Sequence, residues 1–135
     1  MSRHKVYALM AFVGLIGTAV PVLAHHALQA EFDTTKRATF TGVLTRFAMV
    51  NPHVRWFFDV KNPDGTVSKW EVTAGGPGPL RQNGLTRDFK VGDTFTVVYA
   101  PARDGSNLGR AVDFHFPDGH VVTMYHDDPN NPNDR

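Results

Sequence analysis

Three histidines have the clearest potential for chemistry in this sequence: the adjacent pair His25 and His26, and His53, which follows Pro52. If His25 is the first residue of the mature chain, its α-amine and its imidazole together can chelate one metal ion. One more imidazole completes a T-shaped site of three nitrogen atoms, called a histidine brace, which suits the preference of Cu(II) for tetragonal nitrogen ligands. His53 is the best-placed outside donor, because Pro52 fixes the turn that presents it, and His26 is the alternative ligand. We therefore predict a Cu(II) site at His25, with His53 or His26.

The same histidines also have an interpretation without a metal. Paired histidines just after a cleavage site occur as solvated residues or in a hydrogen-bonded lead-in segment, and a histidine in a turn often bonds to the backbone. Two other histidines, His115 and His120, flank a predicted turn and are expected at the surface.

The copper hypothesis depends on the N-terminal segment being removed. Residues 1–24 have a basic start at residues 3–5, an uncharged apolar run at residues 6–20, and the small side chains Val22 and Ala24 where signal peptidase requires them. The apolar run is shorter than the roughly 20 residues that span a bilayer as a helix. We expect a signal peptide that is cut after Ala24, and hence a periplasmic or secreted protein without stable membrane insertion. An uncleaved anchor is the alternative.

Removal of the signal peptide also changes the charge of the protein. The whole chain has 14 Lys and Arg against 13 Asp and Glu, and loss of Arg3 and Lys5 leaves 12 against 13, a change from +1 to −1. A domain of this charge has no electrostatic reason to hold nucleic acid, so we expect no nucleic-acid partner. The chain has no cysteine, which excludes disulfides, thiolate metal sites and a cysteine nucleophile.

Catalytic groups are hard to assemble from this sequence. Neither Ser68 nor Ser106 follows the strand–turn–helix elbow of a serine hydrolase. The acids Glu31 and Asp33 lie on a polar segment, where carboxylates are usually solvated. The glycines at residues 75–78 lack the lysine and the helix of a phosphate-binding loop. These residues favour a binding protein over a hydrolase or an oxidoreductase.

The elements that must position these residues are predicted to be strands. Alternating apolar and polar residues predict strands at 38–50, 54–60, 67–74, 94–100, 110–116 and 120–125. One helical turn is expected at 80–83, where Gly84 ends it. Three strands, a helical connector and two or three further strands are the order of an OB-type barrel. The predicted fold is therefore mainly β, a small OB-like barrel at 38–125, with a β-sandwich as the alternative. A lead-in at 25–37 precedes it and a disordered polar tail at 126–135 follows it.

Alternation along the strands also predicts which side chains point inward. In the first strand, Phe40 and Leu44 share one face and Phe47 belongs to the other, while Gly42 suggests a bend or bulge. In the next two strands Trp56, Phe58 and Trp70 are assigned to the core. Phe57, beside Arg55, is the one aromatic side chain of that group expected to be exposed. The fifth strand is expected to align Val112, Phe114 and Phe116.

Several short motifs together resemble a known family. They are His25-His26-Ala27, Glu31-Phe32-Asp33, Thr41-Gly42-Val43, Asn51-Pro52-His53-Val54, Gly84-Leu85-Thr86-Arg87, Val91-Gly92-Asp93 and Asp104-Gly105-Ser106. In this order they resemble a family of small exported bacterial proteins of unknown function, whose mature chains begin with paired histidines. Ala27 stands where such chains more usually have serine, so no hydroxyl is expected to act there.

The resemblance itself implies no particular chemistry, and two expectations for function remain. The first is an exported binding protein that holds Cu(II) through its processed N-terminal histidine. The second is a metal-free periplasmic accessory domain that docks on another protein through a barrel face or through the Asn51-Pro52-His53 loop.

Overall fold

The structure, a computed structural model, describes residues 30–124. The chain divides into two compact units, Met1–Glu31 and Phe32–Arg135, and every strand within residues 30–124 belongs to the second unit. The expected signal peptide at 1–24, the pair His25 and His26, and the polar tail at 126–135 lie outside the described residues.

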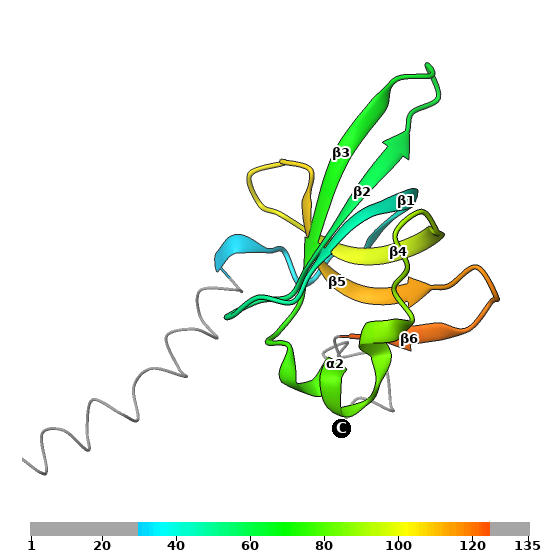
Figure 1. Ribbon diagram of the computed structural model, residues 1–135. Helices are drawn as coiled ribbons and strands as arrows, with labels where there is room; N and C mark the ends of the chain where they lie inside the picture. Colours follow the sequence, from blue (N-terminus) through cyan, green and yellow to red (C-terminus); the bar gives the residue numbers. More distant parts are fainter. Residues whose placement is uncertain (1–29, 125–135) are drawn as a thin grey trace, which may run out of the picture. The chain divides into compact units, whose positions relative to one another are not determined.

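The described elements follow the predicted order, with strand ends that differ by a few residues (Figure 1). They are β1 (Ala38–Ala48), β2 (Arg55–Lys61), β3 (Val67–Thr73), helix α2 (Gly78–Gln82), the 3-10 helix η1 (Leu85–Arg87), β4 (Thr94–Pro101), β5 (Leu108–His115) and β6 (Val121–Thr123). Gly84 follows helix α2 with a φ of 70°, a left-handed conformation that glycine adopts without strain. The predicted helix end at Gly84 is therefore confirmed.

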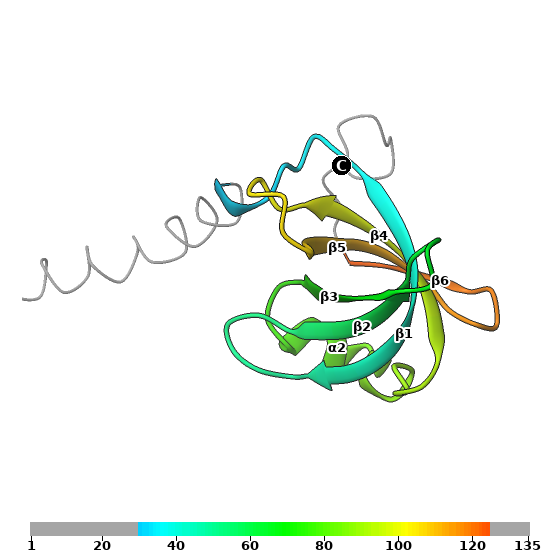
Figure 2. The ribbon, with the colours of Figure 1, turned by 90° about the horizontal axis from the view of Figure 1, so that it is seen from above.

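The strands form a closed barrel. Their order is β3-β2-β1-β4-β5-β6, and a parallel pairing of β3 with β5, between residues 71–73 and 108–110, closes the ring (Figure 2). All other neighbouring strands pair antiparallel. Five strands in the cyclic order β1-β2-β3-β5-β4, with the helix between β3 and β4, make an OB-type barrel. The predicted fold is confirmed over the sandwich, and β6 extends β5 as an additional strand.

Aromatic rings fill the interior of the barrel. Trp56, Phe58 and Phe114 are almost wholly buried, as alternation predicts for β2 and for the end of β5. Phe89, from the connector after η1, packs among them, with its ring centroid 5.3 Å from that of Trp56 and 5.0 Å from that of Phe114. The connector therefore closes one end of the barrel with a side chain of its own.

Two β-bulges change which residues face the core. In β1, Leu44 pairs with Phe58 and Arg46 pairs with Phe57, so Thr45 is an extra residue. The bulge turns Phe47 inward, where its ring stacks on Trp56 at 5.4 Å. The prediction that Phe47 lies on the face opposite to Phe40 and Leu44 is therefore wrong, because one inserted residue reverses the alternation that follows it.

The second bulge lies in β5. Val98 pairs with Asp113 and Tyr99 pairs with Ala111, so Val112 is the extra residue. The core cluster contains Ala111 in place of Val112, together with Phe114 and Phe116. The predicted alignment of Val112 with these two phenylalanines is wrong for the same reason.

Gly42 lies at a close approach between strands, and the bulge of β1 is at Thr45. A Cβ atom on Gly42 would lie 2.9 Å from Cγ2 of Val60 and 3.1 Å from the carbonyl oxygen of Asp59.

Within residues 30–124, no helix is both long enough and apolar enough to cross a bilayer.

Candidate functional site

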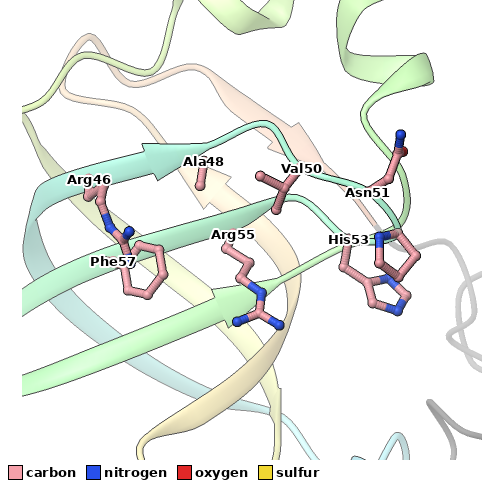
Figure 3. A pocket seen from close by; sticks show the side chains of 8 residues that line it. Arg46, Ala48, Val50, Asn51, His53, Arg55 and Phe57 are labelled. Carbon is pink, nitrogen blue, oxygen red and sulfur yellow. The ribbon is translucent and has the colours of Figure 1, made fainter.

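A pocket of about 220 Å³ lies where β1 ends and β2 begins. We call it the loop pocket, and its walls are Arg46, Ala48, Val50, Asn51, Pro52, His53, Arg55 and Phe57 (Figure 3). The connecting loop contains a cis peptide bond between Asn51 and Pro52. The outward-facing side chains of β1 and β2 and this loop therefore contribute to one concave surface.

The end of β3 holds the loop in place. Val54 is fully buried, and its backbone N–H donates to the carbonyl oxygen of Gly75 at 3.1 Å. The carbonyl oxygen of Val54 accepts hydrogen bonds from the backbone N–H of Ala74 and the hydroxyl of Thr73, both at 3.1 Å. These bonds fix the backbone next to His53 and so position its side chain.

His53 lines this pocket and has an unpaired ring nitrogen. Its side chain is partly buried, and its Nδ1 atom is buried and forms no hydrogen bond within the described residues. The alternative prediction for His53, a hydrogen bond to the backbone of its turn, does not apply to this atom. Residues 30–124 contain no group of three or more His, Asp or Glu side chains placed to hold a metal ion. A brace at His53 would need nitrogen atoms from outside that range, and His25 and His26 lie there.

Arg46 and Phe57 form the opposite wall of the loop pocket. The guanidinium carbon of Arg46 lies 3.7 Å from the centroid of the Phe57 ring, a cation–π contact. The sequence predicts that Phe57 is exposed and does not single out Arg46, because regular alternation would place residue 46 on the same face as Phe40 and Leu44. The bulge at Thr45 moves Arg46 to the outer face. The alternation of apolar and polar residues in the sequence does not indicate where that bulge lies.

A second arginine lies between these two walls. Nη1 of Arg55 is 3.3 Å from Oε1 of Glu71 on β3, and the Arg55 side chain is 51% exposed. Arg55 is in the pocket wall, whereas Glu71 is not.

A second pocket of about 220 Å³ lies on another part of the barrel, around Phe116, Asp118 and His120. The His120 ring stacks on Phe116 at 4.1 Å, and its Nδ1 forms a hydrogen bond with the carboxylate of Asp118. The backbone N–H and the ring of His120 lower the pKa of Asp118. His120 and His115 are exposed, as predicted. The contacts of His120 are those of a closed turn.

Aspartate side chains close other turns in a similar way. Asp104 accepts hydrogen bonds from the backbone N–H of Ser106 at 2.9 Å and from its hydroxyl at 2.7 Å. The hydroxyl bond, followed by the backbone bond, lowers the pKa of Asp104. The hydroxyl of Ser106 therefore closes its loop through the carboxylate of Asp104.

The fold and the site together define a class of protein: a small OB-type barrel with a polar, positively charged pocket at its first loop. The chain belongs to the Family of unknown function (DUF6152), whose family model matches residues 12–111. Among curated protein sequences, none matches this chain.

Solved structures with a similar fold include two crystal structures of Rim1, the mitochondrial single-stranded DNA binding protein of S. cerevisiae. The first is 14% identical with a TM-score of 0.48, and the match covers 67% of this chain and 96% of the Rim1 chain. The second, labelled with selenomethionine, is 12% identical with a TM-score of 0.47, and the match covers 63% and 96% of the two chains.

Proposed function

We propose that this protein is an exported, non-enzymatic binding domain and that the loop pocket is its ligand site. The observation that carries the proposal concerns His53, a residue of the pocket wall whose Nδ1 atom is buried without a hydrogen-bond partner in the described range. An unsatisfied buried polar atom costs about 1–3 kcal/mol, and such atoms often mark the place of an ion, a water molecule or a ligand. In OB-type barrels, the loop between the first two strands commonly carries the ligand.

Cu(II) is the ligand that the sequence favours for this site. His25 would bind the ion through its amine and its ring, and His53 would supply the third nitrogen, with His26 as the alternative donor. An imidazole nitrogen without a hydrogen bond keeps its lone pair for a metal when the ring proton is on the other nitrogen. Three such nitrogen donors fit the tetragonal preference of Cu(II).

The experiment starts from protein purified after export, with its first residue identified by mass spectrometry. Calorimetry and EPR then follow a titration with Cu(II). We expect one bound ion with nitrogen hyperfine structure, and binding at least about tenfold weaker in the double variant His25→Ala, His53→Ala. His115→Ala removes an exposed histidine and is the matched control. Equal Cu(II) affinity of the double variant and the unaltered protein would contradict the proposal.

A second candidate function is metal-free docking on another exported protein through the same loop. The observation that favours it is Val50, an apolar side chain that is 47% exposed beside the exposed residues Asn51 and Pro52. An exposed apolar side chain among groups that form hydrogen bonds is suited to a protein contact.

Docking makes predictions that differ from those of copper binding. The variant Val50→Asp should abolish the complex with the partner, whereas His25→Ala should leave it intact. Val67→Asp is the control, because Val67 is 54% exposed at the far end of the β2–β3 hairpin. A complex that survives Val50→Asp, or that is lost with His25→Ala, contradicts docking through this loop.

We also propose that this domain does not bind single-stranded DNA, although the two yeast proteins are described as DNA binding proteins. The formal charge of −1 after removal of residues 1–24 disfavours contacts with phosphates. Fluorescence anisotropy of a labelled oligothymidylate at physiological salt should show no saturable binding. Saturable binding that weakens steeply with salt would contradict this expectation.

A further inference from the structure

Two guanidinium groups, those of Arg46 and Arg55, line the loop pocket, and we propose that they bind a small molecule through a carboxylate group. The inference rests on the proposed function, because both use the loop pocket. It concerns other side chains, however: Arg46, Phe57 and Arg55 in place of the histidines.

Arg46 is held by a neighbouring ring, and its positive charge has no counterion within residues 30–124. Its guanidinium carbon lies over the Phe57 ring, 3.7 Å from the centroid, a contact that limits the movement of the group and leaves N–H donors for another group. Within residues 30–124, no carboxylate forms an ion pair with Arg46. An oriented guanidinium group without a counterion is suited to bidentate binding of a planar carboxylate.

Arg55 provides further donors beside it. Its ion pair with Glu71 is one contact of 3.3 Å through Nη1. A guanidinium group has five N–H donors, so most of those on Arg55 remain for a ligand. Arg46 and Arg55 both line the pocket, and in Figure 3 their side chains lie on the same side of the strands as the Phe57 ring.

The net charge of Arg46, Arg55 and Glu71 favours a carboxylate over a phosphate as the ligand. Glu71 offsets Arg55, so Arg46 leaves about one positive charge for the ligand to balance. A carboxylate supplies one negative charge, whereas a phosphate monoester carries about −1.5 to −2 at neutral pH. A monocarboxylate is therefore the better match.

The size and the lining of the pocket indicate the rest of the ligand. A volume of about 220 Å³ equals about seven water molecules at their liquid volume, which is enough for a carboxylate and a small apolar group. Ala48, Val50 and Pro52 provide apolar surface next to the two arginines. The geometry therefore fits a small monocarboxylate with an apolar body.

The test uses benzoate as the probe, titrated into the purified processed protein and followed by calorimetry and by amide NMR shifts. Benzamide has the same shape without the charge, and phenyl phosphate carries more charge. We expect benzoate to shift the amides of residues 46–57, benzamide to leave them unchanged, and phenyl phosphate to bind more weakly than benzoate. Arg46→Gln and Arg55→Gln should each weaken benzoate binding at least about tenfold. Arg87→Gln, which alters an exposed arginine of η1, should not.

Three results would overturn the inference: benzoate binding that survives Arg46→Gln, equal binding of benzamide, or tighter binding of phenyl phosphate. The copper experiment fails or succeeds separately, since the double variant His25→Ala, His53→Ala keeps both arginines. Cu(II) binding without benzoate binding overturns only the carboxylate site, and benzoate binding without Cu(II) binding overturns only the copper proposal.

Discussion

At the scale of single residues, the aspartates of the turns show how the fold controls ionisation. Asp33 accepts a hydrogen bond from the hydroxyl of Thr35 at 2.7 Å and pairs with Lys36 at 3.0 Å. The bond from Thr35 and the contact with Lys36 lower the pKa of Asp33 from 3.8 to about 2. Hydrogen bonds from Thr66 lower the pKa of Asp64 in the same way. These turns are closed by ionised carboxylates.

The turn at Asp33 predicts a particular dependence of stability on pH. Because the pKa of Asp33 is lower in the folded protein, its contribution to stability is full above the ordinary value of 3.8 and is lost as the pH falls to about 2. Asp33→Asn should therefore lower the melting temperature at pH above that range and have little effect below it. Circular dichroism melts across this range measure the difference, with Asp88→Asn as a control for loss of a surface charge. A deficit of the same size at every pH would show that the ionised turn is not its cause.

At the scale of the elements, β1 connects the barrel to the loop pocket. Alternation in the sequence correctly predicts that Phe40 and Leu44 face the core, because the first part of the strand is regular. It fails from Thr45 onward, because a bulge inserts one residue without a recognisable signature in the side chains. The sequence therefore predicted His53 as a candidate ligand and Phe57, beside Arg55, as an exposed aromatic residue, and it did not single out Arg46.

The close approach of β1 and β2 predicts the effect of a single methyl group. Gly42→Ala would place a Cβ atom 2.9 Å from a side-chain carbon of Val60 and 3.1 Å from a backbone oxygen. We expect a loss of about 1–3 kcal/mol in the free energy of unfolding, because a backbone atom cannot yield as a flexible side chain can. Urea denaturation measures it. Gly75→Ala is the matched control, since a Cβ atom there would meet nothing within 4 Å. If both variants lose equally, steric contact at Gly42 is not the reason.

At the scale of the whole molecule, the packing of aromatic side chains stabilises the barrel without disulfide bonds. The chain has no cysteine, so the barrel is held by its core and its strand pairings. The predicted order of three strands, a helical connector and further strands identified the fold. The sequence did not reveal that Phe89 joins the core, because the connector has no periodicity from which a buried face can be read. Phe89 has ring contacts with five aromatic side chains: Phe47, Trp56, Phe95, Phe114 and Phe116.

The ring contacts of Phe89 predict that the connector contributes strongly to the free energy of unfolding of the barrel. Phe89→Ala should cost about 3–5 kcal/mol in the free energy of unfolding, because it removes a buried ring and leaves a cavity. Val91→Ala alters a side chain that is 64% exposed in the same connector, and it should change stability by less than about 0.5 kcal/mol. Equilibrium urea unfolding compares the two variants. A small effect of Phe89→Ala would mean that the barrel closes without the connector.

We have proposed that the loop pocket binds a ligand through His53 and its neighbours. Amide NMR spectra of the processed protein with substoichiometric Cu(II) test it most directly, because the paramagnetic ion broadens the resonances of nearby residues. Our account predicts that the amides of His53, Val54 and Arg55 broaden first, while those of His115 and His120 persist. Broadening that begins at His115 and His120, or that leaves His53 unaffected, would contradict it.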